Sequence, residues 1–236
     1  DVRRVAPDIV LLANLGAVQL NRGVSAEDCR RLLGMLRADA LVLHLNPLQE
    51  ALQPEGDTCF GDLLPRIAEL CAALEEPVIV KEVGWGISDD LVVALLDAGV
   101  AAVDVAGAGG TSWSEVERHR MSDPVRARVA ASFAGWGIPT AIAIERARQA
   151  APDATLVASG GVRSGVDIAK AVALGADLVG VAGPLLRSAA VSERALWDTV
   201  DVMLEELRLC MFCVGAASPG ALRATGRLER VGEAAV

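Results

Sequence analysis

Short apolar runs alternate along the chain with longer segments whose apolar residues recur every three or four positions. Seven of the short runs are rich in Val, Ile, Leu and Ala, and their length and composition predict buried strands. They span residues 8–16, 40–45, 77–83, 101–107, 139–144, 154–161 and 177–183.

The longer segments place apolar residues at positions i, i+3, i+4 and i+7, which predicts helices with one buried face. The clearest are residues 25–38, 60–74, 88–99 and 164–176. Strands that alternate with helices indicate β-α-β units and a parallel sheet. No linker, low-complexity tract or block of charge divides the sequence, so residues 1–236 are predicted to form a single domain.

Seven strand–helix units fit a (β/α)8 TIM barrel lacking one unit better than an open sheet. A Rossmann sheet carries a GxGxxG motif after its first strand, and the segment ANLGAVQLNRG does not supply one. The predicted fold class is therefore α/β, a (β/α)8 TIM barrel whose first strand is missing from residues 1–236. Because the sequence starts with Asp1 rather than methionine, we expect further protein before it, encoded upstream or supplied by another chain.

Composition narrows the possible partners. Hydrophobic residues make up 53% of the chain, which suits a parallel sheet covered by helices. No run reaches the roughly 18 uncharged apolar residues that a bilayer span needs, and no signal peptide is evident, so we expect a cytoplasmic protein without a membrane partner. The net charge of −9 argues against nucleic acid, whose binding needs clustered Lys and Arg. An anionic ligand would need a local binding site.

Polar and glycine residues gather where the predicted strands end, which is where a barrel carries its chemistry. In chain order they are Asn14; His44, Asn46, Gln49 and Glu50; Lys81 and Glu82; Asp104 with GAGGTSW; Thr140; SGGVR; and AGP. A purely structural sheet has no need of this pattern. The sequence therefore predicts a functional site at the mouth of the barrel.

Two of these strand ends indicate an anionic ligand. Lys81 follows apolar residues, so its cation can hold an anion or stabilise a delocalised anionic ring, although a lysine can also simply reach solvent. The segment ASGGVRSGVDIAKAVALGA (158–176) places a glycine pair and Arg163 directly before a helix, whose first N–H groups form an anion site. Together with GVAGP (180–184), it matches the phosphate site built after the last two strands of such barrels.

The cluster after the second predicted strand suggests a cation and a proton donor or acceptor. The oxygen ligands of Glu50, Asn46 and Gln49 suit Mg²⁺, which keeps several waters and bridges to substrate phosphates. His44 and Gln49 can orient or protonate a bound group, although His44 also fits a buried structural role. For Glu55 and Asp57, both a catalytic role and a role as solvated loop carboxylates stay open. His119 is expected to be structural, and Cys210 and Cys213 are expected to be buried reduced thiols, with a metal or redox role as the alternative.

Several strings resemble the type 2 isopentenyl-diphosphate isomerases, among them HLNPLQEALQPEGD, PVIVKEVGWGIS, DVAGAGGTSWSEVERHR and ELRLCMFCVGA. These enzymes are FMN-dependent (β/α)8 barrels that interconvert isopentenyl and dimethylallyl diphosphate. The resemblance runs from ANLGAVQL to the MFCVGA segment, which is nearly the whole chain. It implies a small-molecule substrate, reduced FMN as the acid–base agent, Mg²⁺, NADPH as a reductant, and assembly as a homotetramer or homo-octamer.

The resemblance also assigns residues. It implies that Gln49 contacts the substrate and that Glu50 ligates Mg²⁺. With the cluster after the second strand, this predicts Gln49 and His44 as catalytic residues and Asn46 and Gln49 as substrate-binding residues. The implied cofactor contacts are Asn14, Lys81 and Thr111 at the flavin, and Gly161, Val162, Arg163, Ala182 and Gly183 at its phosphate. The family's further N-terminal stretch, with a glycine-rich flavin turn and an Arg/Lys pair, is not present in these residues.

Two other functions remain open from the sequence. An FMN oxidoreductase of the 2-hydroxy-acid oxidase kind shares the lysine and the Gly-Gly-Arg features, but it needs a histidine base and arginines at late strand ends. Neither His44 nor His119 lies late enough for that role. The second alternative is a truncated homologue without catalytic activity.

Overall fold

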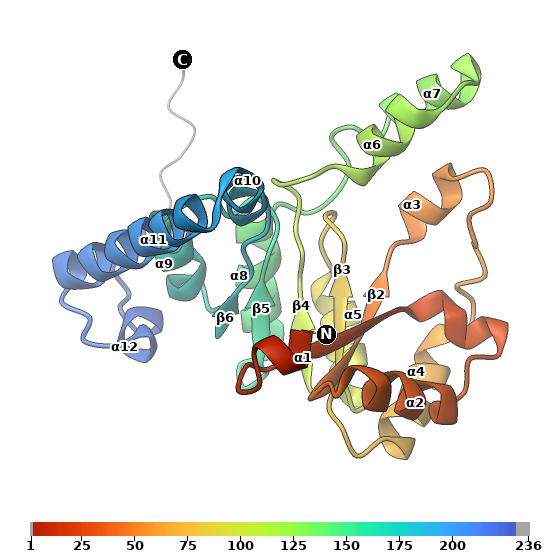
Figure 1. Cartoon of the computed structure of the whole chain (residues 1–236), viewed down its shortest axis with the longest axis horizontal. Coiled ribbons are helices and arrows are strands. Elements are labelled where there is room, and N and C mark those ends of the chain that lie inside the picture. The colour runs from red at the N-terminus through yellow and green to blue at the C-terminus, as the bar shows by residue number, and fades with distance from the viewer. Residues whose placement is uncertain (1, 230–236) are drawn as a thin grey trace.

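The computed structural model describes residues 2–229, and it contains one sheet of six parallel strands (Figure 1). The strands are β1 (Leu12–Gly16), β2 (Ala40–Leu45), β3 (Val78–Glu82), β4 (Ala102–Asp104), β5 (Leu156–Ala158) and β6 (Leu178–Val179). Each strand pairs with the next one along the chain, whereas a doubly wound sheet reverses its strand order. The predicted fold class, an α/β fold of the barrel type, is confirmed.

Helices connect the strands and cover the sheet. They are α1 (Val2–Val5), the 3-10 helix η1 (Ala17–Arg22), α2 (Ala26–Leu36), α3 (Pro47–Leu52), α4 (Leu63–Ala73), α5 (Asp89–Asp97), α6 (Trp113–Arg120), α7 (Pro124–Ala131), α8 (Thr140–Ala150), α9 (Gly165–Ala173), α10 (Gly183–Val191), α11 (Glu193–Val214) and α12 (Pro219–Arg223). The four clearest helices predicted from the sequence correspond to α2, α4, α5 and α9. Over residues 2–229, no helix combines the length and apolarity that a membrane span requires.

The strand predicted at residues 139–144 is wrong, because this segment begins α8. Pro139 occupies the N-cap position, and the buried residues Ala143, Ile144 and Ala147 recur at helical spacing. A short apolar run does not distinguish a strand from a buried helix turn. The described residues therefore supply six strands rather than seven, which is two fewer than a closed eight-stranded barrel contains.

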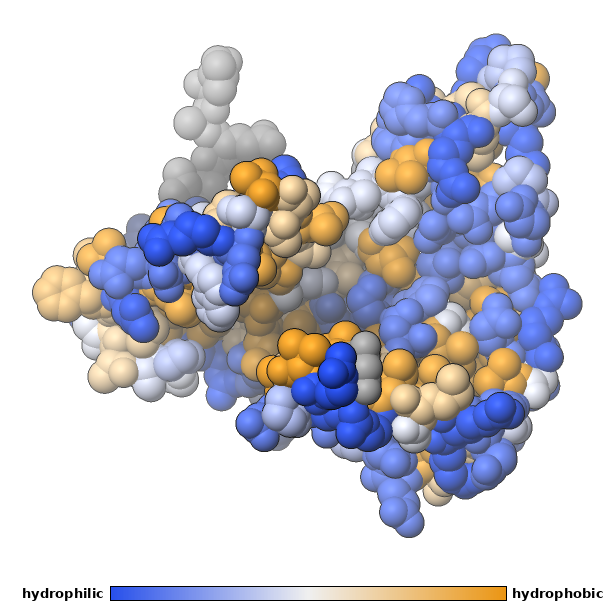
Figure 2. All heavy atoms as spheres, viewed as in Figure 1, coloured by the Kyte–Doolittle hydropathy of each residue, from blue (hydrophilic) through white to orange (hydrophobic). Residues whose placement is uncertain are grey.

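Within the described residues, one side of β1 and one side of β6 have no strand partner, because β1 pairs with β2 alone and β6 pairs with β5 alone. Apolar side chains are exposed at both edges: Val10 is 77% exposed, and Leu178 is 61% exposed. Figure 2 shows apolar atoms around α1, which precedes the edge strand β1. Exposed edges of this kind favour pairing with further strands.

Alternation along the strands decides which residues face the inside of the barrel. In β3, Val78 and Val80 are buried in the core between sheet and helices, while Ile79 and Lys81 point to the opposite face. Paired residues of parallel strands lie side by side on one face. The register His44–Lys81–Asp104 therefore places three ionisable side chains in one row near the carboxyl ends of β2, β3 and β4.

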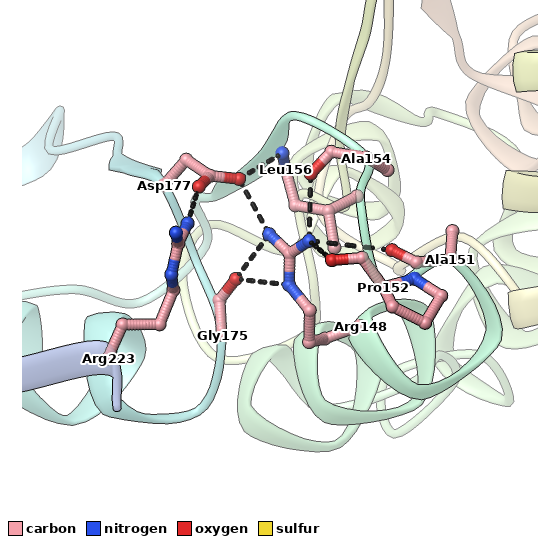
Figure 3. A network of polar contacts seen from close by, with 8 residues as sticks. All are labelled: Arg148, Ala151, Pro152, Ala154, Leu156, Gly175, Asp177 and Arg223. Carbon is pink, nitrogen blue, oxygen red and sulfur yellow. Dashed lines mark hydrogen bonds and ion pairs between the residues drawn. The ribbon is translucent and has the colours of Figure 1, made fainter. Parts of the chain in front are cut away.

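The opposite end of the sheet is held by an arginine network (Figure 3). Arg148 of α8 donates hydrogen bonds to the backbone oxygens of Gly175, Pro152 and Ala154 at 2.6–2.9 Å, and to the Asp177 carboxylate at 2.6 Å. Asp177 also accepts from the Leu156 amide and pairs with Arg223 of α12. One guanidinium group therefore joins α8 to the loops that enter β5 and β6.

Arg148→Ala is expected to lower the free energy of unfolding by about 3 kcal/mol, because several carbonyls and the Asp177 carboxylate lose a charged donor. Urea denaturation followed by circular dichroism measures this loss. Arg146→Ala is the matched control, since Arg146 is exposed on the same helix and should change stability by less than about 0.5 kcal/mol. Equal losses in the two variants would contradict a structural role for the network.

Candidate functional site

A cavity of about 560 Å³ lies at the carboxyl ends of β3 to β6. Figure 2 shows the surface hollowed between the α10–α11 side of the molecule and the α6–α7 pair. This volume is in the range of small-molecule sites. Seven of the eight residues predicted to contact a cofactor line it: Lys81, Thr111, Gly161, Val162, Arg163, Ala182 and Gly183.

The floor of the cavity is made by two glycine-rich loops in backbone contact. A Cβ atom on Gly160 would lie 2.0 Å from the Gly107 oxygen, and one on Gly161 would lie 2.5 Å from the Gly109 oxygen. Both Gly160 and Gly161 also have positive φ angles, which disfavour any side chain. Thr140 Oγ1 donates to the Gly160 oxygen at 2.6 Å and ties the start of α8 to the same floor.

One end of the cavity is suited to an anion. Ala182 and Gly183 line it at the N-terminus of α10, where no side chain caps the helix. The start of α9 is less available, because Arg163 N donates to Asp167 and Asp167 N donates to Ser164. Arg163 and Arg187 also line the cavity, so a phosphate there would meet helix N–H groups and two guanidinium groups.

Arg187 was not identified from the sequence. It follows Gly183 by one helical turn, and a Cβ on Gly183 would lie 3.4 Å from its Nη1 atom. The signal available was this i, i+4 spacing after the GVAGP turn, which becomes meaningful only once α10 is known to start at residue 183.

His44 lies next to Lys81 in the row across the sheet, and Asn14 Nδ2 donates to its Nδ1 atom at 3.1 Å. Burial lowers the pKa of His44, the charge of Lys81 lowers it further, and Glu50 opposes both. The imidazole is therefore neutral at neutral pH, with its proton on Nε2 because Nδ1 accepts a hydrogen bond. His44 is thus a hydrogen-bond donor rather than a cation.

Asn46 and Glu50 form an oxygen-rich pair at the start of α3. Glu50 Oε1 accepts from Asn46 Nδ2 at 2.8 Å, and Glu50 Oε2 accepts from the Asp57 amide at 2.6 Å. Asn46 is 5% exposed, and its Oδ1 atom is buried without a hydrogen-bond partner. A buried carbonyl oxygen beside a carboxylate fits a hard cation such as Mg²⁺.

Within the described part of the chain, no group of three or more His, Cys, Asp or Glu side chains is arranged to hold a metal ion. A cation beside Glu50 would therefore depend on waters or on the oxygens of a bound substrate. That arrangement is the habit of Mg²⁺, which rarely occupies a cage made only of protein groups.

Glu117 is the principal residue of the candidate site that the sequence did not reveal. It is 4% exposed, and its Oε1 atom accepts from Gln49 Nε2 at 3.1 Å and from Gln53 Nε2 at 2.8 Å. Because Glu117 lies in the highly charged helix α6, the apolar pattern gave no sign of its burial. Its position after the GAGGTSW turn was the signal that could have drawn attention to it.

The predicted residues fall into two groups. Asn14, His44, Asn46, Gln49 and Glu50 do not line the 560 Å³ cavity, and they lie on β1, β2 and α3 at the same end of the sheet. A second cavity of about 420 Å³ lies beside Glu117 and is also lined by Gln53, Glu55, Arg120 and Arg126.

Asp57 and His119 belong to neither group. Asp57 pairs with Arg22 at 2.5 Å, a hydrogen bond that lowers the pKa of its carboxyl group. His119 is exposed on α6, and all five cysteines are free thiols. The expectation that Cys213 is buried is wrong, because its side chain is exposed on α11.

The chain matches the FMN-dependent dehydrogenase family over residues 55–228, and it belongs to that family of flavin-binding α/β proteins. Among its curated relatives is the isopentenyl-diphosphate delta-isomerase of Synechococcus sp., 57% identical over 229 residues, which cover 97% of this chain and 66% of the relative. The isopentenyl-diphosphate delta-isomerase of Nostoc sp. is 50% identical over 230 residues, with 98% and 66% covered. The chain thus spans slightly less than two thirds of the length of these relatives.

Solved structures show the same fold at lower identity. A mandelate oxidase variant superimposes with a TM-score of 0.61 and 22% identity, covering 90% of this chain and 62% of that one. The GMP reductase of Trypanosoma brucei gives a TM-score of 0.59 at 22% identity, covering 91% of this chain and 44% of that one. At this identity the likeness concerns the fold alone.

Proposed function

We propose that this chain is part of an FMN-dependent isomerase that interconverts isopentenyl diphosphate and dimethylallyl diphosphate. The observation that carries the proposal is the cavity, which joins Lys81 at one side to the N-terminus of α10, Arg163 and Arg187 at another. FMN suits such a cavity, because a cation can stabilise its anionic ring and an anion site can bind its phosphate. The isomerase relatives, 57% and 50% identical, supply the reaction.

The residues around the cavity fit FMN. The glycine floor lets backbone approach closely, as the positions blocked to Cβ atoms at Gly160 and Gly161 indicate. Arg163 and Arg187 would hold the phosphate, and Thr111 and Lys81 would contact the flavin, together with Asn14 from β1. Reduced FMN, when bound, supplies acid–base chemistry at the substrate carbons, with NADPH as the proposed reductant and no net oxidation.

The diphosphate of the substrate needs a cation, because the chain carries a net charge of −9. Glu50 would ligate Mg²⁺, and the buried oxygen of Asn46 would add a second oxygen ligand or accept a hydrogen bond from the hydrated ion. Glu50 is held for this role by the Asn46 amide and by the Asp57 backbone. The cation would neutralise the diphosphate and fix its position.

The isomerisation adds a proton to the terminal methylene carbon of the substrate and removes one from a neighbouring methylene group. Gln49 donates its amide to the buried Glu117 carboxylate, which fixes its orientation. His44 is held by Asn14 with a proton on Nε2 and can donate it as a hydrogen bond. Gln49 and His44 would orient the reacting carbons, with Glu117 acting through Gln49.

The test is an isomerisation assay with purified protein. Turnover should require both reduced FMN and Mg²⁺. Equal activity in flavin-free protein, or with oxidised flavin and no reductant, would overturn the proposal.

Glu50→Gln should lower turnover at least about 100-fold at limiting Mg²⁺, because the variant keeps the size of the side chain but loses its charge. FMN should remain bound, since Glu50 does not line the cavity. A Mg²⁺ titration of turnover measures the effect, and Glu55→Gln in the following loop is the matched control. A variant with wild-type kinetics across the titration would show that Glu50 is only a loop carboxylate.

The runner-up is an FMN-dependent oxidase of 2-hydroxy acids, a kind of activity that the mandelate oxidase relative by fold carries in its name. The two histidines of the chain, His44 and His119, lie on β2 and α6, and neither follows β5 or β6. Among the described residues, a 2-hydroxy-acid oxidase would therefore lack the histidine base that it needs at a late strand end. Flavin reduction by a 2-hydroxy acid, without isomerisation, would favour the oxidase.

Assembly as a homotetramer or homo-octamer stays a prediction.

A further inference from the structure

Asp104 is an ionisable residue that the proposed reaction does not use. It ends β4 and pairs in register with Lys81 of β3, so both side chains face the inside of the barrel. Burial raises the pKa of its carboxyl group, and part of that rise is counteracted by hydrogen bonds from Ser159 and Ala106 and then by the charge of Lys81. A carboxylate in such surroundings persists only where hydrogen bonds or a cation stabilise it.

The contacts of Asp104 reach both glycine-rich loops. Ser159 Oγ, which lines the cavity, lies 2.9 Å from each carboxylate oxygen, and the Ala106 amide donates to Oδ1 at 3.0 Å. Ala106 has a φ of 38°, a left-handed conformation that this hydrogen bond helps to hold. Asp104 therefore lies beneath the floor of the cavity and beside its only lysine.

Three ionisable groups surround the Lys81 ammonium group. His44 from β2 is neutral, as its lowered pKa requires. Glu82 is adjacent in sequence, but its Oε2 atom accepts three backbone N–H groups at 2.5–2.7 Å on the other face of β3. Burial lowers the pKa of Lys81, and Asp104 is the largest influence that raises it.

We propose that Asp104 is a positioning residue that keeps Lys81 protonated and directed at the cavity, where its charge stabilises an anionic ring. Lys81 lines the cavity, and its Nζ atom donates to the Glu82 backbone oxygen at 2.7 Å, so two ammonium hydrogens remain for the cavity. Asp104, its neighbour in register, acts on the ammonium group through its charge. The inference rests on the proposed function for the identity of the ring. The charge relation between Lys81 and Asp104 holds with or without FMN, and it can be tested in the apoprotein.

The composition of the chain makes the test direct, because Lys81 and Lys170 are its two lysines. Lysine labelled with ¹³C at Cε would give two signals, and Lys170→Arg would assign them. In the wild-type apoprotein, the pKa of Lys81 should lie below the ordinary value for lysine, because burial disfavours its charge. In Asp104→Asn, which keeps hydrogen-bonding groups but loses the charge, the pKa of Lys81 should fall further.

Two controls separate charge from structure. Ser159→Ala removes a hydrogen bond to Asp104 but leaves its charge, so it should move the Lys81 titration less than Asp104→Asn does. Asp97→Asn on the exposed end of α5 should not move it at all. An unchanged or raised pKa of Lys81 in Asp104→Asn would overturn the proposal, whether or not FMN binds.

A further measurement covers the case in which Asp104→Asn does not fold. The Lys81 signal of the wild-type chain should then show a second inflection at the pH where Asp104 takes up its proton. A Lys81 signal without that inflection would contradict the coupling.

In the FMN-loaded protein, Asp104→Asn should shift the alkaline limb of the pH–turnover profile to lower pH, because Lys81 loses its proton at lower pH. An alkaline limb at the wild-type pH would count against the proposal.

Discussion

Gly160→Ala should abolish FMN binding and lower the free energy of unfolding by on the order of 4 kcal/mol. A Cβ atom at this position would lie 2.0 Å from the Gly107 oxygen, and the φ of 100° is one that alanine rarely adopts. The two loops that form the floor of the cavity would have to separate. Flavin absorbance after gel filtration and urea denaturation of the apoprotein measure the two effects.

Gly34→Ala is the matched control for this substitution. Gly34 lies inside α2, and a Cβ atom there would have no neighbour within 4 Å. Alanine should stabilise the helix by about 0.8 kcal/mol and leave flavin binding unchanged. If Gly160→Ala behaved like Gly34→Ala, the close approach of the loops would not be a requirement of the site.

Glu117→Gln should lower turnover at least about 100-fold while FMN stays bound. The substitution keeps the shape of a buried side chain but replaces its carboxylate, so Gln49 and Gln53 lose a charged acceptor. Gln49 would then be free to turn away from the reacting carbons. Steady-state kinetics with reduced FMN, together with the flavin content of the purified variant, measure the effect.

Glu115→Gln tests whether any carboxylate on α6 has the same influence. Glu115 is two residues away and forms an ion pair with Arg118 at 2.8 Å, in which both side chains are about a third exposed. Its loss should change turnover by less than about twofold, because its carboxylate pairs with Arg118 rather than with Gln49. A turnover in Glu117→Gln within about threefold of the wild type would remove Glu117 from the proposed mechanism.

Much of the fold and part of the candidate site could be predicted from the sequence, because they depend on local patterns. Hydrophobic periodicity placed α2, α4, α5 and α9, and five of the six strands lie inside segments longer than themselves. The sixth strand, β2, has the same bounds as its predicted segment. The glycine pair at 160–161 and Lys81 could be identified because glycine and a cation are unusual at the end of an apolar strand.

The remaining features depend on tertiary contacts that leave no local signal. The segment 139–144 has apolar residues that fit either period, and the packing of Ala143 and Ile144 against the core favoured the helix. Glu117 is buried only because α6 lies against α3, and Arg187 reaches the cavity only because α10 begins at Gly183. Neither relation can be derived from spacing along the chain.

The contact of Gly107 with Thr140 and Gly160 also limits how this sequence can diverge. A Cβ atom on Gly107 would lie 2.4 Å from the Thr140 Cα atom, and one on Gly160 would meet the Gly107 oxygen. Since each obstacle is backbone, no change of a neighbouring side chain could make room. Compensatory mutation is therefore closed to these two loops, so they can diverge only if both backbones move together.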